Sequence, residues 1–116
     1  MATFFETADG FAAWLEKLGA TETELIVGYH KRGSQRPCMT WAESVDEALC
    51  FGWIDGVRKR IDEHAYQIRF TPRKPTSIWS RINIERARVL KREGRMREPG
   101  LEAFARRRED KSRIYS

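Results

Sequence analysis

The stretch ALCFGWIDGVRKRIDEHAYQIRFTPRKPTSIWSRIN, residues 48–83, decides the fold, because it combines a helix end, two strands and the start of a second helix. Within it, apolar and polar residues alternate along AYQIRFT, residues 65–71, as in a strand of a sheet with one solvated face. The preceding segment WIDGVRKRI, residues 53–61, has the same extended pattern. Because residues 62–64 supply a short polar turn, the two segments are predicted to form a hairpin.

The alternation also predicts which side chains share a face of this hairpin. Tyr66, Ile68 and Phe70 are expected to face the core. Because successive side chains of a strand alternate between its faces, a polar set is expected on the opposite face: Arg58, Arg60, Gln67, Arg69 and Thr71. This register leaves Asp55 on the buried side unless the first strand is irregular near Gly56. The register of residues 53–61 therefore stays open.

Periodicity extends the assignment toward the N-terminus. An apolar stripe with helical spacing predicts a helix over residues 8–18, and alternation predicts a strand that begins at Glu24. Thr40 and Glu43 have the spacing of a capping box, which predicts a helix over residues 41–51.

Two further helices are predicted after the hairpin. Thr76 or Ser77 is expected to cap a helix over residues 78–93, and a short helix over residues 99–108 follows. The predicted fold class is α+β, with a small, mainly antiparallel sheet of about three strands packed on one side by about four helices.

Length and composition limit the class of protein. The 116 residues suit one domain, so we expect a single domain over residues 1–116 with a frayed, charged tail at residues 109–116. Apolar residues make up 41% and charged residues 34%, which is typical of a folded soluble protein. The longest apolar run, residues 48–54, is far shorter than the ~20 residues of a membrane helix, and the N-terminus has no export signal. We therefore predict no membrane insertion and a cytoplasmic location.

The charge is distributed unevenly along the chain. Residues 1–57 contain four Lys/Arg against nine Asp/Glu, and residues 58–116 contain eighteen against eight, so their net charges are −5 and +10. Such asymmetry suggests an anionic partner for the second half, charge compensation within the fold, or a homo-oligomer.

Residue types that usually support catalysis or metal binding are sparse. Cys38 and Cys50 could pair in principle, but without an export signal two free thiols are the better interpretation. His30 and His64 have no second ligand at metal-like spacing, and the glycines form no phosphate-binding pattern. We therefore expect no metal site and no cofactor, and we assign no catalytic residue.

Candidate ligand-binding residues are concentrated between residues 53 and 83. Asp55 could orient a guanidinium in a salt bridge or act as a carboxylate in a small pocket. The cations, the hydroxyls and the expected helix start at Ser77 suit an anion. The interleaved aromatic residues could stack bases, although such alternation is more often a feature of a core. The candidate set is Trp53, Asp55, Arg58, Arg60, Arg69, Thr71, Arg73, Lys74, Ser77, Trp79, Ser80 and Asn83.

Several short motifs together resemble one bacterial family. EALCFGWIDG at residues 47–56, RFTPRK at 69–74, SIWSRIN at 77–83 and GRM at 94–96 look like the YdeI/OmpD-associated family, which is labelled "bacteriocin-protection". The resemblance covers nearly the whole chain. It implies an uncharacterised cytoplasmic bacterial α+β domain with a link to bacteriocin resistance or outer-membrane-protein phenotypes, and it implies no reaction or catalytic residue. Relatives of this kind commonly continue into a further helical region, so we expect either a short member or a fragment.

Three functions are consistent with these patterns. The leading hypothesis is a non-enzymatic binding module whose basic surface engages an anionic small molecule, nucleic acid or an acidic protein. The alternative is an enzyme for a small anionic substrate, in which Asp55 is the acid or base, arginines form a clamp, and Ser80 or Asn83 is a polar partner. The third is a self-assembly module, in which the acidic half of one copy meets the basic half of another.

Overall fold

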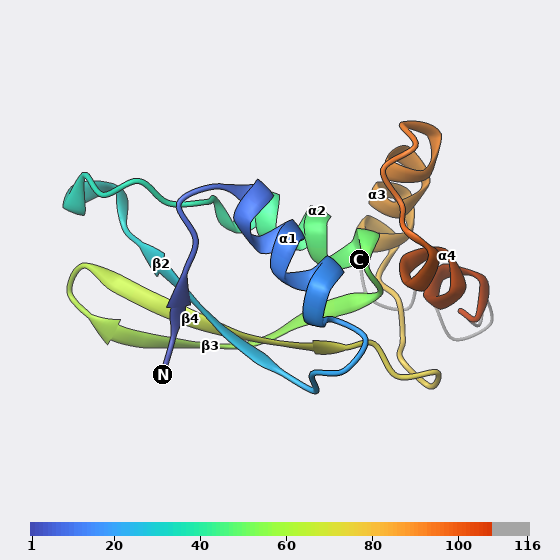
Figure 1. The fold of residues 1–116 in the computed structure, drawn as a ribbon, viewed down its shortest axis with the longest axis horizontal. Helices are drawn as coiled ribbons and strands as arrows, with labels where there is room; N and C mark the ends of the chain where they lie inside the picture. The colour runs from blue at the N-terminus through green and yellow to red at the C-terminus, as the bar shows by residue number, and fades with distance from the viewer. Residues whose placement is uncertain (108–116) are drawn as a thin grey trace.

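A four-stranded sheet with helices on one face forms the fold of this protein, as described for residues 1–107 by a computed structural model (Figure 1). The strands are β1 (Thr3–Phe4), β2 (Leu25–His30), β3 (Trp53–Asp62) and β4 (Ala65–Pro72). Their order in the sheet is β1-β2-β4-β3, and the β1–β2 pair is parallel while the other two pairs are antiparallel. The predicted α+β class is confirmed, with four strands instead of about three. Strand β1 was missed because two residues are too short for alternation to be recognised.

Four α-helices accompany the sheet within residues 1–107: α1 (Ala8–Leu18), α2 (Trp41–Cys50), α3 (Arg81–Arg92) and α4 (Glu98–Ala105), with a short 3₁₀ helix, η1 (Arg32–Ser34). The predicted capping box of α2 is confirmed. The Thr40 hydroxyl accepts from the Glu43 backbone N–H at 3.1 Å, and the Glu43 carboxylate accepts from the Thr40 N–H at 2.9 Å. None of the helices in the described residues is long and apolar enough to cross a bilayer. The tail expected at residues 109–116 lies outside the described residues.

Helix α3 begins three residues later than the sequence indicates. Its N-cap is Ser80, whose hydroxyl accepts from the Asn83 N–H at 3.1 Å, and not either of the expected residues. The Ser77 hydroxyl instead accepts from the Arg73 guanidinium at 2.7 Å, and the Trp79 side chain is buried in the core. These two contacts hold residues 77–79 in a non-helical conformation. The expectation of a helix start at Ser77, beside the cations of the loop, was therefore wrong.

Strand β3 contains a β-bulge that changes which way its arginines face. Asp55 pairs with Phe70, but Arg58 pairs with Ile68, so β3 gains one residue relative to β4 near Gly56, where the sequence left the register open. Opposite residues of an antiparallel pair share a face. Arg58 and Arg60 therefore project on the same side as the helices, beyond the part of the sheet that the helices cover, and the expected polar face is wrong in this respect. The members of that face that do lie on the open side are Gln67, Arg69 and Thr71.

Aromatic side chains link the helices to the sheet in one core. Trp53 is 2% exposed and meets Trp14 of α1 edge to face, with ring centroids 5.6 Å apart. Phe11 packs in a similar way on Phe70 of β4 at 5.2 Å. Trp79 packs against the ring of Phe104, which joins α4 to the same cluster. Two of the candidate residues, Trp53 and Trp79, are therefore core residues.

Two glycines allow α4 to pack on the end of α2. Gly52 follows α2 with a φ of +76°, and a Cβ there would lie 2.7 Å from the carbonyl oxygen of Pro99. A Cβ at Gly100 would clash with the carbonyl oxygen of Cys50. Because these obstacles are backbone atoms, a side chain at either position would displace α4.

Candidate functional site

The structure distributes the twelve candidate residues over several places and does not gather them in one site. Trp53, Arg73 and Trp79 are buried; Arg69 and Thr71 lie on the open face; Arg58 and Arg60 lie on the helix side of the hairpin; Asp55, Ser80 and Asn83 line a hollow beside α2; Lys74 and Ser77 lie in the loop after β4.

Arg73 stabilises this loop from inside the protein. It is 5% exposed, its guanidinium carbon lies 3.9 Å from the centre of the Trp79 ring, and it donates to Ser77. Burial lowers the pKa of Arg73 to about 10, against the opposing effect of the Asp55 charge. Arg73 therefore belongs to the core and not to the expected basic surface.

Ion pairs connect the basic second half of the chain to the acidic first half. Four such pairs are Arg69–Glu24 at 2.6 Å, Arg86–Asp46 at 2.7 Å, Arg95–Glu47 at 2.9 Å and Arg97–Glu16. Because most of these groups are partly exposed, each pair contributes at most about 1 kcal/mol to stability. Their arrangement nevertheless shows that the charge asymmetry between the two halves of the chain is partly compensated within the fold. Such compensation was one of the three explanations offered for the asymmetry.

Another group of cations has no ion pair within residues 1–107 and lies at the hairpin end of the sheet. We call this group the hairpin basic surface: Lys31, Arg32, Arg36, Arg58 and Arg60. Three of its members come from the loop that carries η1, and two come from β3. The Lys31 N–H donates to the carbonyl oxygen of His64 at 2.8 Å, and His30 pairs with Ala65, so the loop is held against the start of β4. In Figure 1 the β3–β4 turn extends past α1 and α2 beneath this loop.

A stack of side chains fixes the position of Arg58. Its guanidinium carbon lies 3.9 Å from the centre of the Tyr66 ring, and Tyr66 stacks on Tyr29 with centroids 4.8 Å apart and 9° between the planes. The Tyr29 hydroxyl is hydrogen-bonded at 2.7 Å to the hydroxyl of Ser44, which is also buried. Burial raises the pKa of both tyrosines, although Arg58 opposes this effect at Tyr66. A planar guanidinium held in this way can present its N–H groups to an oxyanion with little loss of side-chain entropy.

A hollow of about 380 Å³ lies beside this stack. Its lining includes Tyr66, Trp41, Lys31, Arg32 and Arg36. Trp41 is 50% exposed, although its indole is large and apolar. The hollow therefore combines cations with an aromatic surface that is open to solvent.

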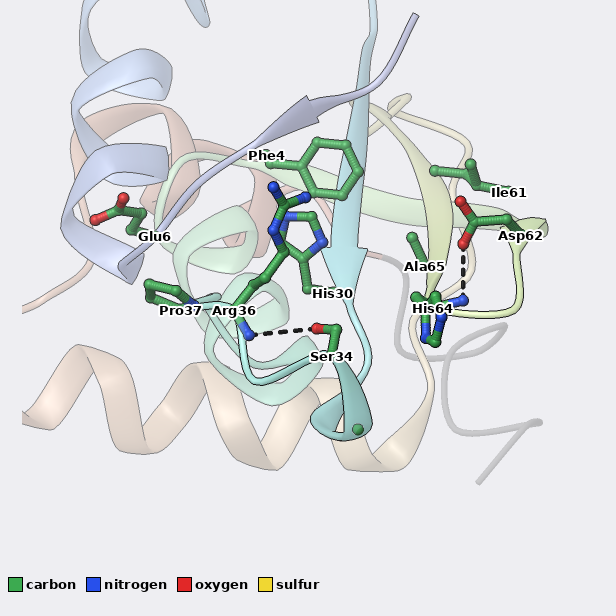
Figure 2. Close-up of a pocket in the computed structure, with 11 residues that line it drawn as sticks. Phe4, Glu6, His30, Ser34, Arg36, Pro37, Ile61, Asp62, His64 and Ala65 are labelled. Atoms are coloured by element: carbon green, nitrogen blue, oxygen red, sulfur yellow. Dashed lines mark hydrogen bonds between the residues drawn. The ribbon is translucent and has the colours of Figure 1, made fainter.

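A larger hollow of about 890 Å³ adjoins it, and His30 and Arg36 line both (Figure 2). The ring of Phe4 covers His30 with centroids 4.3 Å apart, while His64 lies across the hollow near the turn. Two carboxylates, those of Glu6 and Asp62, also line this space, so its charge is mixed. Among the described residues, no group of three or more His, Cys, Asp or Glu side chains is arranged to hold a metal ion. The smaller hollow is thus better suited to an anion.

Sequence reasoning missed the three loop cations of the hairpin basic surface. A signal for them does exist, because Lys31, Arg32 and Arg36 are three of the four cations in residues 1–57. Their proximity to Arg58 depends on the pairing of β2 with β4, which the local sequence does not reveal.

The hollow beside α2 contains the residues of the enzymatic alternative. Asp55, Ser80 and Asn83 all line this space of about 440 Å³. The arginine that lines it, Arg86, is held by two hydrogen bonds to Asp46, and the Ser80 hydroxyl caps α3. In the part of the chain that the structure describes, the expected arginine clamp is therefore not formed at Asp55.

Cys50 gives a pH-dependent prediction. It is buried, and burial raises the pKa of its thiol from 9.0 to about 11. Between these values the folded chain retains a proton that the unfolded chain loses. The contribution of Cys50 to stability is therefore fully present below pH 9 and is lost as the pH rises toward 11, by up to about 1.4 kcal/mol per pH unit. Cys50→Ala is expected to flatten this part of the curve when urea unfolding is followed at several pH values.

Cys38→Ala is the matched control for this experiment, since Cys38 is a half-buried free thiol. Ionisation of Tyr29 and Tyr66 also affects stability at high pH, but both residues are present in all three proteins. An equal flattening by both cysteine substitutions would show that burial of Cys50 is not the cause.

Comparison with known proteins identifies the family of this chain. No curated protein and no solved structure matches it significantly. The resemblance to the YdeI/OmpD-associated family stays a prediction. A family described as "Domain of unknown function (DUF8412)" matches residues 3–103, a range that begins in β1, ends within α4 and contains every residue of the hairpin basic surface. This chain therefore belongs to the DUF8412 family.

Proposed function

We propose that this domain is a non-enzymatic binding module for an anionic ligand, namely single-stranded nucleic acid, which it binds at the hairpin basic surface. One observation carries this proposal: the Arg58 guanidinium is stacked on Tyr66 and has no carboxylate partner within residues 1–107, with four further unpaired cations nearby. Four other arginines of the second half are used in ion pairs with acidic residues of the first half. At the hairpin end of the sheet, cations without an ion pair in residues 1–107 thus lie together around a fixed guanidinium.

The aromatic lining favours nucleic acid over an acidic protein. Single-stranded binders combine cations that follow the backbone with aromatic rings on which bases stack. Trp41 supplies such a ring in the same hollow as Lys31 and Arg32. Both faces of Tyr66 are already covered, by Tyr29 and by Arg58, so Tyr66 positions the guanidinium and Trp41 stacks the base.

A second basic region, between α3 and α4, supports this function less well. Its hollow of about 690 Å³ is lined by Lys91, Arg92, Phe104 and Arg107. Arg107 donates to the carbonyl oxygen of Phe104 and lies over the ring of that residue, which is 7% exposed. Within residues 1–107 this region therefore offers cations without an open aromatic surface.

Fluorescence anisotropy with a labelled oligothymidylate of about ten nucleotides tests the proposed function. We expect binding at low salt, with the logarithm of the association constant falling linearly with the logarithm of salt concentration. The slope for single strands is about −0.7 per phosphate neutralised, so three to five contacts give roughly −2 to −3.5. Absence of binding at low salt, or binding that does not respond to salt, would contradict the proposal.

The other two hypotheses have weaker support. Self-assembly through opposite charges is less well supported, because four arginines of the basic half are already paired with acidic residues of the same chain. The enzymatic alternative has an acid and two polar partners in one hollow but no free guanidinium there among the described residues. The link to bacteriocin resistance or outer-membrane-protein phenotypes stays a prediction of the resemblance.

A further inference from the structure

The hollow of about 440 Å³ between α2, β3 and the start of α3 is a second potential binding site. Its volume lies in the range of small-molecule sites. Trp41 lines both this hollow and the one beside the tyrosine stack, but the other residues that define the two spaces differ. What this hollow can bind is therefore argued from its own residues.

Apolar side chains form much of its wall. Trp41 and Ile82 are 50% and 66% exposed, respectively, and Val45 of α2 lies in the same lining. Removing large apolar side chains from water lowers the free energy of the system. A ligand with an apolar body would cover this surface.

Asp55 is the charged group of the lining that lacks a partner. Within residues 1–107 its carboxylate makes no hydrogen bond or ion pair, and the residue is half-buried. The other two charged residues, Asp46 and Arg86, neutralise each other through two hydrogen bonds of 2.7 Å each. Asp55 thus supplies the net charge of the hollow and its unused hydrogen-bond acceptor.

Positive charge near Asp55 does not make the hollow an anion site. Arg73 attracts Asp55 electrostatically, but it does not line the hollow, and its guanidinium is engaged with Ser77 and Trp79. The N-terminus of α3 adds a partial positive charge. An anion in the hollow would nevertheless approach the Asp55 carboxylate directly, where repulsion is strongest because Coulomb energy varies inversely with distance.

We infer that this hollow binds a small organic cation, namely a protonated primary amine attached to an aromatic or alkyl body. The ammonium group donates hydrogen bonds to the Asp55 carboxylate and lies against the indole of Trp41, and the apolar body covers Ile82 and Val45. The site does not depend on the proposed nucleic-acid function.

Three probes with the same phenyl body and different head groups test this inference: phenethylamine, 2-phenylethanol and 3-phenylpropionate. Each is titrated into the ¹⁵N-labelled full chain, and the indole N–H signal of Trp41 is followed after its assignment with Trp41→Phe. We expect a saturable shift with phenethylamine and a dissociation constant of roughly 1 mM, as befits a ligand of this size. The neutral alcohol should bind at least about tenfold more weakly, since it lacks the charge-assisted hydrogen bond, and the carboxylate should bind most weakly.

Asp55→Asn provides the matching protein variant, because it removes the charge with almost no change in shape. Its affinity for phenethylamine should fall to that of the wild-type protein for 2-phenylethanol. Asp9→Asn is the control: Asp9 is an exposed acid on α1, away from this hollow, and its substitution should leave the affinity unchanged. Equal binding of amine and alcohol, stronger binding of the carboxylate, no saturable shift, or unchanged binding by Asp55→Asn would each overturn the inference. If Asp55→Asn does not fold, the three probes on the wild-type protein still decide the matter.

Discussion

Trp53→Ala is expected to lower the free energy of unfolding by about 3–5 kcal/mol, the cost of truncating a large aromatic side chain in a packed core. Trp53 is 2% exposed and packs edge to face on Trp14 between α1 and the sheet. Neighbouring side chains cannot fill the volume that the indole leaves, so both the lost burial and the cavity contribute. Urea unfolding followed by far-UV circular dichroism measures the effect.

Trp41→Ala is the matched control, because it removes the same side chain from a position that is 50% exposed. We expect it to change stability by less than about 1 kcal/mol. If Trp53→Ala left stability close to that of the wild-type protein, the assignment of Trp53 to the core would be wrong, and its candidacy as a ligand-binding residue would have to be reconsidered.

Arg58→Glu is expected to weaken binding of oligothymidylate about tenfold at low salt and to reduce the steepness of the salt dependence by roughly one contact. The substitution removes the guanidinium that is stacked on Tyr66 and places a negative charge in the hairpin basic surface. Stability should fall by only about 0.5–1 kcal/mol, the value of an exposed cation–π contact. Anisotropy titrations at several salt concentrations measure both the affinity and the slope.

Arg69→Glu is a close control for this charge reversal. Arg69 is also an exposed arginine of the β3–β4 hairpin, but it lies on the open face and is paired with Glu24. The net charge of the whole protein changes equally in the two variants. A smaller loss of affinity in Arg69→Glu than in Arg58→Glu would show that position matters, whereas equal losses would mean that total charge alone controls binding.

Local patterns were sufficient to predict much of the fold. The apolar stripe of α1, the capping box at Thr40 and the alternation in β4 each depend on residues close together in the chain, and each predicted the correct element. Strand β1 could not be found in this way, because it consists of two residues that are ordered by pairing with β2.

The errors arose where tertiary contacts choose between similar local options. Three hydroxyl residues near the start of α3 could each have capped it, and the burial of Trp79 together with the Arg73–Ser77 hydrogen bond selected Ser80. The bulge in β3 adds one residue to the strand, and one residue reverses the facing of the side chains from Arg58 to Arg60. That is why Arg58 was assigned to the wrong face of the sheet.

The candidate site was predicted only in part for a related reason. Charge counts revealed the acidic and basic halves but not the pairing of Arg86 with Asp46 or Arg95 with Glu47, which join residues 40 and 48 positions apart. The cations of the hairpin basic surface, which form no such ion pair within the described residues, could be identified only after these pairs were known. Asp55, Ser80 and Asn83, which the enzymatic hypothesis combined, line one hollow. Asp55 precedes the bulge and pairs with Phe70, which places it on the helix side of the sheet.

The most direct test of the proposed nucleic-acid surface is a titration of the ¹⁵N-labelled protein with oligothymidylate, followed by amide and arginine side-chain N–H chemical shifts. We predict that the largest changes occur at residues 31–36 and 58–60, at Tyr66, and at the side-chain N–H of Arg58. Changes confined to the basic region of Lys91 and Arg92 on α3, or to the open face around Arg69, would contradict the account.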